Sequence, residues 1–266
     1  MKFAAGQFRH RLGALAWAAI AVSVTPVCAQ TVGVRIADAK PGDVRLLISN
    51  GLRIPFETVK AQAESVIGHH IVVEYGASRR LTPQIEADQP FELTIMTREV
   101  VDEMVVKGKV RPGLTDIART AVAVAQRGGP VGDASTPSSL KLLLLGAKII
   151  HFTGIGAARP TIDKTFESLG IADDIKSRLD DSSSILTTSG PSLAEGQYEL
   201  VLNLASEMTP TPGWTFLGPI PMQFQVPVIM SSGVGTKGDA VAAKALISFL
   251  QGPAIEGPLK SSRMSR

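Results

Sequence analysis

The chain has 266 residues, of which 44% are hydrophobic and 19% are charged, a composition that supports a folded core. Its 27 lysine and arginine residues against 24 aspartate and glutamate residues give a formal net charge of +3. Lys2, Arg9 and Arg11 supply that excess, so the remaining chain is neutral and the charge gives no support for binding nucleic acid.

The N-terminus has the pattern of a secretory signal peptide. A basic start precedes the apolar run 12–24, which is too short to span a membrane comfortably, and small residues surround Cys28. We expect cleavage before Gln30, so that residues 1–29 are the signal peptide and the protein acts in the periplasm. A membrane anchor and a lipoprotein modified at Cys28 are the less favoured alternatives. The mature chain then contains no cysteine and forms no disulfide.

Three segments share one design, in which an apolar strand is followed by a turn of small residues and then a helix. The strands are 46–48, 71–75 and 149–152, and the turns are 49–51, 76–78 and 153–158. In an α/β sheet such turns lie at the carboxyl ends of the strands, where ligands bind. Helix N-termini present free N–H groups and a positive dipole end. The three turns together therefore predict a cradle for a small anion.

Strands and helices alternate in two sets, from 44 to 110 and from 140 to 204, which predicts an α/β fold with parallel strands. Two strand-like connectors, 118–125 and 225–230, join the sets, as in a two-lobed protein with a hinge of two crossover strands. We expect a first lobe of residues 30–120 plus 226–266, a second lobe of residues 121–225, and a ligand in the cleft between them. The C-terminal helix should pack on the first lobe, and the tail 260–266 should be frayed. The other expected helices are 54–67, 82–87, 98–107, 140–145, 160–169 and 173–179, and the later strands are 91–96, 148–152, 198–204 and 226–230.

Polar side chains end three successive strands of the first set. Ser49, Asn50, Ser78 and Thr97 carry hydroxyl or amide groups that donate to an oxyanion, although the same residue types also make turns and cap helices. The strand 198–204 and the turn after it bring Asn203, Ser206 and Glu207 to the cleft side. Glu207 either contacts the ligand or braces the hinge.

Three arginines, Arg79, Arg80 and Arg159, lie at or just after two of the turns. An arginine in such a place can form paired hydrogen bonds with a carboxylate, whereas the alternative is a solvated surface side chain.

Motifs of common enzyme classes are missing from the sequence. It contains no Gly-x-Ser-x-Gly elbow, phosphate-binding P-loop, Cys-x-x-Cys or His-Glu-x-x-His, so we expect no metal and no cofactor. His69 and His70 are expected to be exposed turn residues, and His151 is expected to be a structural histidine with satisfied hydrogen bonds.

The chain resembles the periplasmic molybdate-binding proteins, which are solute receptors of bacterial ABC importers. The resemblance covers residues 44–252 and implies a type II periplasmic binding fold, a small anionic ligand, an ABC importer permease as partner, and a monomer that binds no nucleic acid. The matching stretches are 46–52, 75–78, 91–97, 118–127, 156–159, 169–173, 194–207, 216–219 and 242–253.

The resemblance also implies binding residues. The family holds its oxyanion with serine hydroxyls at the first two turns, backbone N–H groups at the third turn and a tyrosine on a later strand. Ser78 and Ala158 match two of these positions, whereas the first serine is replaced by Gly51, with Ser49 and Asn50 beside it. The residues expected to bind the ligand are Ser49, Asn50, Gly51, Ser78, Arg79, Thr97, Ala158, Arg159, Asn203 and Glu207.

The tyrosine of the family is also replaced, because its position falls near Asn203 or Leu204. The same branch includes sequences that resemble periplasmic aconitate isomerase, and the added arginines and Asn50 suit carboxylates. The leading interpretation is therefore a non-catalytic receptor for a small anion, and the alternative is a cofactor-free isomerase of an unsaturated tricarboxylic acid. That enzyme needs a general base, for which Glu207 and His151 are the candidates. A scaffold without a ligand is disfavoured by the three turns.

Overall fold

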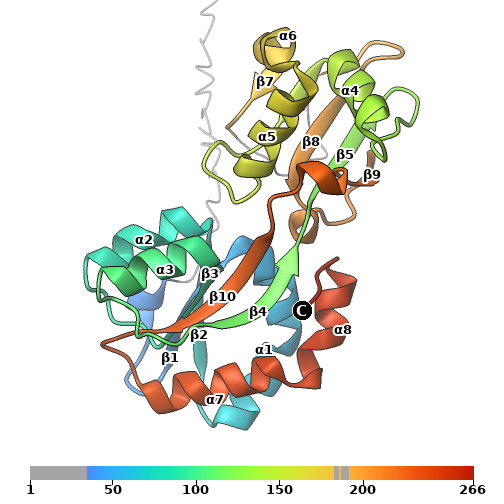
Figure 1. Cartoon of the computed structure of the whole chain (residues 1–266). Helices are drawn as coiled ribbons and strands as arrows, with labels where there is room; N and C mark the ends of the chain where they lie inside the picture. Colours follow the sequence, from blue (N-terminus) through green and yellow to red (C-terminus); the bar gives the residue numbers. More distant parts are fainter. Residues whose placement is uncertain (1–34, 183–185, 187–191) are drawn as a thin grey trace, which may run out of the picture. The chain divides into compact units, whose positions relative to one another are not determined.

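The computed structural model describes residues 35–182, 186 and 192–266, which belong to one compact unit (Figure 1). The predicted signal peptide and its cleavage site lie outside the described residues. Within the described part of the chain, no helix is both long enough and apolar enough to cross a membrane.

The first sheet contains five strands in the order β2-β1-β3-β10-β4. They are β1 (Val44–Ser49), β2 (Ile71–Gly76), β3 (Leu93–Thr97), β4 (Thr115–Thr120) and β10 (Val228–Val234). β1 runs parallel to β2 and β3, whereas β10 is antiparallel to β3 and β4. The register pairs Ser49 with Gly76 and Ile48 with Ile95, so β1, β2 and β3 end at the same edge of the sheet.

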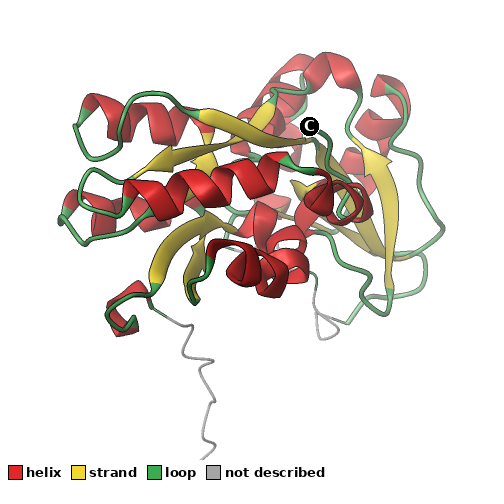
Figure 2. Ribbon diagram, turned by 90° about the horizontal axis from the view of Figure 1, so that it is seen from below, coloured by secondary structure: helices red, strands yellow, loops and turns green. Residues whose placement is uncertain are grey.

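Helices cover both faces of this sheet (Figure 2). They are α1 (Arg53–Ile67), α2 (Ser78–Glu86), α3 (Arg98–Val106) and α7 (Ala240–Gln251), with α8 (Glu256–Ser261) beside α1. Leu46 and Ile48 join the apolar cluster that contains α1 and α7 side chains, whereas Leu47 joins the cluster that contains α2 and α3 side chains. This alternation follows from the two-residue period of a strand. α7 packs on the first sheet, as expected.

The second sheet has the order β7-β6-β8-β5-β9. Its strands are β5 (Val122–Gly128), β6 (Ile149–His151), β7 (Leu179–Asp180), β8 (Tyr198–Leu204) and β9 (Trp214–Pro219), and its helices are α4 (Pro137–Gly146), α5 (Arg159–Leu169) and α6 (Ala172–Ile175). β6 is parallel to β7 and β8, and β5 is antiparallel to β8 and β9. Side chains of α4, α5 and α6 share one apolar cluster with β6 and β8.

Two connections join the sheets. A single residue, Ala121, separates β4 from β5, and residues 220–227 lead from β9 back to β10. The connector 118–125, expected as one strand, is therefore part of two strands that belong to different sheets. The two-lobed α/β fold is confirmed, and we call the first sheet with its helices the first lobe and the second sheet with its helices the second lobe. The lobe boundaries stay a prediction.

Several elements differ from the expectation. α2 begins at Ser78 rather than residue 82, and β10 continues to Val234 because the ladder buries Ser231 and Ser232, whose hydroxyls bond to Asp116 and to the Thr115 carbonyl. The proline-rich stretch contains β9, an edge strand, which is where a sheet tolerates proline. The expected helix 173–179 is the short α6 followed by a 3-10 turn and then β7.

The C-terminal tail is not frayed, and this expectation was wrong. Arg119 and Ser265 exchange two backbone hydrogen bonds of 2.7 and 3.0 Å, and Met264 is buried. Arg266 donates to the carbonyls of Leu250 and Gly252. The basic composition of the tail led us to expect a solvated segment, but its arginine side chains donate to backbone carbonyls instead.

The tail also contacts the second lobe. Arg263, which has a left-handed φ of 56°, donates to the carbonyl of Met208 at 2.8 Å. Its guanidinium lies 4.2 Å from the ring centroid of Phe216 in β9. The last residues therefore connect β4 of the first lobe with the second lobe.

A buried ion pair connects three elements of the first lobe. Glu92, just before β3, accepts hydrogen bonds from the Arg45 backbone at 2.6 Å and from its guanidinium at 3.1 and 2.7 Å. The same carboxylate accepts from the backbone of Asp239, which caps α7. Burial acts to raise the pKa of Glu92, but the hydrogen bonds and charge of Arg45 hold this pKa below its usual value.

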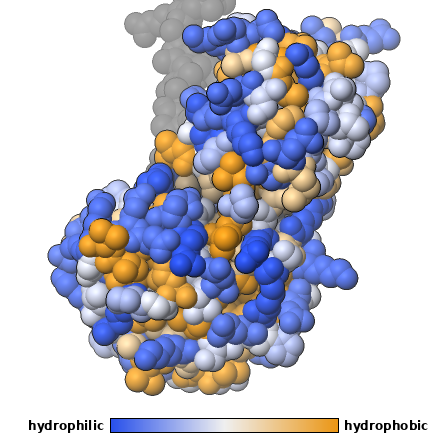
Figure 3. Space-filling model, viewed as in Figure 1, coloured by the Kyte–Doolittle hydropathy of each residue, from blue (hydrophilic) through white to orange (hydrophobic). Residues whose placement is uncertain are grey.

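Apolar side chains on the face seen in Figure 3 form small patches that are separated by hydrophilic residues. The large apolar side chains Leu46, Leu93 and Ile95 lie inside, with at most 1% of their surface exposed. The fold therefore leaves polar groups at the strand ends available for a site.

Candidate functional site

Polar side chains from both lobes line one cavity of ≈390 Å³ where the strands end. A second cavity of ≈720 Å³ shares Ser78, Gly156 and Ala157 with it, so the two form a continuous cleft. The first cavity is lined by, among others, Ser49, Asn50, Ser78, Arg80, Thr153, Ser182, Asn203 and Glu207, and the second by, among others, Arg79, Thr97 and Arg159. The structure thus brings eight of the ten expected residues to the cleft.

Gly51 and Ala158 line neither cavity. A Cβ atom at Gly51 would lie 2.8 Å from the Met230 methyl group and 3.2 Å from Leu204, so a side chain there would enter the packing between the lobes. Ala158 is buried and precedes α5, while its neighbours Gly156 and Ala157 form the cavity wall. Only backbone groups of these two residues remain as candidates for ligand contact.

The Ser78 hydroxyl lies in the cleft wall and donates no hydrogen bond to any of the described residues. Ser78 begins α2, is 7% exposed, and its Oγ accepts a hydrogen bond from the backbone nitrogen of Thr97 at 3.1 Å. Because a hydroxyl both accepts and donates, this bond fixes the oxygen and leaves its hydrogen to donate to an anion.

The helices that begin at the cleft lack side-chain caps. α2, α3 and α5 follow Ala77, Thr97 and Ala158, and no side chain of these three residues accepts a hydrogen bond from its helix. By contrast, α4 has a capping box and Asp239 caps α7, and both helices begin away from the cavities. In the first turn of α2, the N–H groups of Ser78 and Arg79 are therefore available to a ligand, whereas the N–H of Arg80 bonds to the Ala77 carbonyl.

The two neighbouring arginines of α2 have different surroundings. Arg79 forms two hydrogen bonds of 3.3 and 3.1 Å with Glu103 of α3. Arg80 points to the first cavity and has no ion pair or side-chain hydrogen bond with any described residue. Successive helix residues lie about 100° apart around the axis, which separates the two side chains. Of these two arginines, Arg80 is therefore the one without an acidic partner among the described residues.

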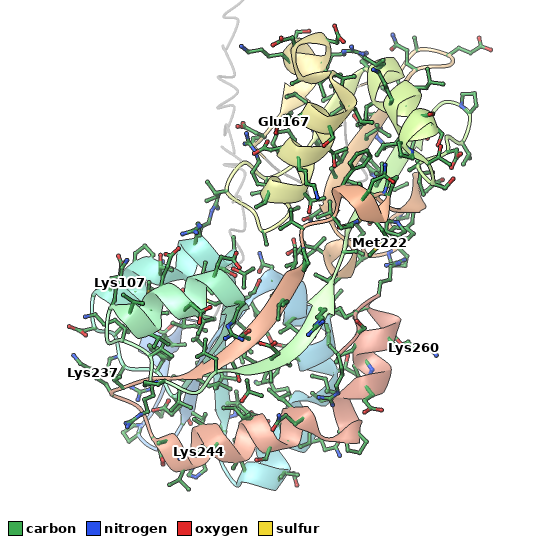
Figure 4. The ribbon with its side chains drawn as sticks, in the orientation of Figure 1. Lys107, Glu167, Met222, Lys237, Lys244 and Lys260 are labelled. Atoms are coloured by element: carbon green, nitrogen blue, oxygen red, sulfur yellow. The ribbon has the colours of Figure 1, made fainter. Side chains whose placement is uncertain are left out.

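Arg159, on the second lobe, bonds to Asp163 one turn along α5 at 2.6 Å. Its guanidinium lies 5.3 Å from the ring centroid of Phe152. No described lysine lines either cavity, and Figure 4 shows Lys107, Lys237, Lys244 and Lys260 on the outer surface. Arginine alone therefore supplies positive side chains to the cleft.

Glu207 adds a carboxyl group to the first cavity. It ends the short 3-10 helix Ala205–Glu207 after β8, and Asn203 Nδ2 donates to its Oε2 at 3.1 Å. Burial raises the pKa of Glu207, and the hydrogen bond from Asn203 opposes this effect. Within the described residues, no Lys, Arg or His forms an ion pair with Glu207. The hydroxyl of neighbouring Ser206 is buried without a partner in the same part of the chain.

His151 is a structural residue, as expected from the sequence. Its Nδ1 lies 2.8 Å from Asp180 Oδ2, and its Nε2 lies 3.3 Å from Glu199 Oε2. The buried Glu199 also pairs with Arg127. His151 lines neither cavity, so it is not placed to act as a base there. His69 and His70 are exposed, as expected.

Sequence reasoning missed several polar cleft residues, among them Thr153 and Ser182. Thr153 lies in the third turn, where the sequence predicted ligand contacts from backbone N–H groups and not from a hydroxyl. Ser182 follows β7, a segment that sequence periodicity assigned to a helix. The described residues contain no cluster of three or more His, Cys, Asp or Glu side chains that could hold a metal ion.

Comparisons with known proteins agree with this geometry. The model of the bacterial extracellular solute-binding protein family matches residues 20–262. The chain belongs to this family. No curated protein sequence matches the chain significantly.

Solved structures show the same fold. The periplasmic molybdate-binding protein of Azotobacter vinelandii is 16% identical, with a TM-score of 0.67 over 84% of this chain and 99% of its own. The sulfate-binding protein SubI of Mycobacterium tuberculosis is 13% identical, with a TM-score of 0.61 over 84% and 86%. L-phospholactate-bound PEB3, a protein of Campylobacter jejuni, is 11% identical, with a TM-score of 0.60 over 84% and 100%.

Proposed function

We propose that this solute-binding protein captures a small anion in the cleft between its lobes. The observation that carries the proposal is the convergence of free donors on one cavity. Ser78 offers its hydroxyl hydrogen, α2 begins there without a side-chain cap, and Arg80 has no acidic partner among the described residues. Hydrogen-bond donors that point to one place without a carboxylate partner stabilise negative charge.

We further propose that the protein works in the periplasm and delivers its ligand to an ABC importer permease, as a monomer. The extracellular family and the predicted signal peptide support this location. The similar structures carry names that refer to molybdate, sulfate and L-phospholactate, all of which are small anions. Arg79, Arg159 and Thr97 in the second cavity would contact only a ligand that extends beyond the first.

Thermal denaturation with a panel of oxyanions, dicarboxylates and tricarboxylates tests this function, because a ligand that binds the folded state raises the melting temperature. Arg80→Ala should weaken the response to the binding anion by about tenfold or more in affinity, since it removes a charged donor. The adjacent Arg79→Ala is the matched control and should have a smaller effect, because Arg79 already pairs with Glu103. Equal binding by the parent and Arg80→Ala would contradict the assignment of Arg80.

A second candidate function, the isomerase of an unsaturated tricarboxylic acid, is favoured by one observation. Glu207 lies in the cavity wall and has a raised pKa, as a general base needs. Incubation with cis- or trans-aconitate, followed by chromatography of both isomers, tests it. Turnover that disappears in Glu207→Gln would establish the enzyme, and binding without turnover would support the receptor.

A further inference from the structure

Besides Glu74, whose two oxygens accept hydrogen bonds from Ile36 and Gln84, the wall of the first cavity contains the carboxyl group of Glu207. This carboxyl group lies in the cavity wall with Ser78 and Arg80, while its Oε2 accepts from Asn203 Nδ2 at 3.1 Å. No hydrogen bond between Oε1 and the described residues accompanies this contact. A bound anion in this cavity therefore meets the carboxyl group of Glu207 as well as the donors.

The charged groups around Glu207 are few. The short helix that carries it contacts β5 and the turn Asn50–Leu52, and neither places a charged side chain in the cavity. Arg80 and Glu74 line the same cavity, and Glu74 is occupied by Gln84 and by the backbone nitrogen of Ile36. Arg263 bonds to the carbonyl of the next residue, Met208, rather than to Glu207.

Above its raised pKa, Glu207 is ionised, and an ionised carboxylate can only accept hydrogen bonds. An anion that also consists only of acceptors, such as sulfate, is repelled by it, because like charges meet with no proton between them. An anion that carries its own hydroxyl hydrogen can donate to the carboxylate while its charged oxygens face Ser78 and Arg80. Donors at Ser78 and Arg80 and the acceptor oxygen of Glu207 therefore fit an anion that has charged oxygens at one end and a hydroxyl hydrogen at the other.

We propose that Glu207 selects anions that carry a hydrogen-bond donor, namely hydroxylated carboxylates or monoprotonated oxyanions, over fully deprotonated ones of the same size. This inference rests on the proposed function, because it assigns a ligand class to the same cleft. A site that hydrogen-bonds a ligand hydroxyl discriminates strongly against the analogue that lacks it, since the buried acceptor is then left unpaired.

Two matched pairs of probes test the selection by isothermal titration calorimetry. Inorganic phosphate and sulfate have the same shape, and at about pH 8 both are dianions, but only phosphate carries a proton. L-malate and succinate differ by one hydroxyl group. The parent should bind the donor-bearing member of at least one pair about tenfold or more tightly than the other member. The pair that shows this difference tells whether the ligand is a monoprotonated oxyanion or a hydroxylated carboxylate.

Glu207→Gln is the decisive variant, because the amide keeps an oxygen for Asn203 and presents a donor to the ligand. The Glu207→Gln variant should lose the preference for the donor-bearing anion and should bind sulfate or succinate more tightly than the parent does. The control Glu167→Gln removes the same charge from an exposed position on α5, and its ratio of affinities for the two probes should equal that of the parent (Figure 4). The melting temperature of each variant without ligand shows whether it is folded.

The outcomes separate this inference from the proposed function. Tight binding of sulfate or succinate by the parent, with no preference for phosphate or malate, overturns the selection but leaves the anion receptor intact. If sulfate binds more tightly at lower pH and this change disappears in Glu207→Gln, the proton comes from Glu207 rather than from the ligand. That result also overturns the proposal that the ligand carries a hydrogen-bond donor. Absence of binding for every anion of the panel overturns the proposed function itself.

Discussion

Replacing Ser78 with alanine should weaken anion binding by about ten- to a hundredfold. A hydrogen bond to a charged group contributes about 1.5–3 kcal/mol, and 1.4 kcal/mol corresponds to a factor of ten in affinity. The structure strengthens this expectation, because the Ser78 oxygen is held by the Thr97 N–H and its hydrogen is left to donate. The effect should appear for every anion that binds, whichever chemical class it belongs to.

Titration calorimetry of the parent and Ser78→Ala with the strongest anion of the panel measures this loss. The control is Ser248→Ala, which changes an exposed serine of α7 outside the cleft. Ser78→Ala also deprives the Thr97 N–H of its acceptor, which costs about 1–3 kcal/mol of stability, so binding is measured well below the melting temperature. If Ser78→Ala is folded and binds like the parent, the anion does not contact this turn.

Removal of the Arg45 side chain should have the largest effect on stability, about 3 kcal/mol of unfolding free energy near pH 7. The buried Glu92 would keep its backbone donors but lose its counter-charge, and an unpaired buried charge is strongly destabilising. Denaturant unfolding of Arg45→Ala measures this loss. The control Arg98→Ala breaks exposed pairs with Asp102 and Asp116 and should cost about 1 kcal/mol or less.

The pH dependence of this pair follows from the lowered pKa of Glu92. A carboxyl group with a lower pKa in the folded state stabilises the fold above its unfolded pKa, and the contribution is lost as the pH falls through the folded pKa. The difference between the parent and Arg45→Ala should therefore be full at pH 7 and shrink in acid below about pH 4. A difference that stays constant from pH 7 to acid would show that the Arg45 stem, rather than the charge pair, provides the stability.

The strand ends could be predicted from the sequence because their geometry follows from the fold. Once β1, β2 and β3 are parallel and adjacent, Ser49 and Thr97 reach the same edge, whatever their partners are. The ends of α1 and α5 could also be predicted, because each helix is followed by a glycine, which ends a helix easily. Gly68 and Gly170 adopt left-handed φ values of 73° and 62°.

Contacts between distant elements could not be predicted in this way. Arg79 and Arg80 are equivalent in local sequence, and only Glu103 on another helix distinguishes them. Gly51 matched a binding position along the chain, but its missing side chain would face Met230 and Leu204 rather than the ligand. The tail at 262–266 looked solvated because its partners are backbone carbonyls, which no composition reveals.

That tail contacts both lobes outside the cleft, so its contacts would contribute to the free energy of any closure of the cleft. Affinity in a cleft that closes on its ligand depends on the free-energy difference between the open and closed forms as well as on the contacts with the ligand. Arg263 donates to the carbonyl of Met208, the residue after Glu207, and packs on the ring of Phe216, while Ser265 bonds to the backbone of β4. Any rotation between the lobes would therefore change these contacts. Substitutions in the last five residues would then change the solute concentration at which the cleft fills, and a purification tag attached to Arg266 would disturb the same contacts.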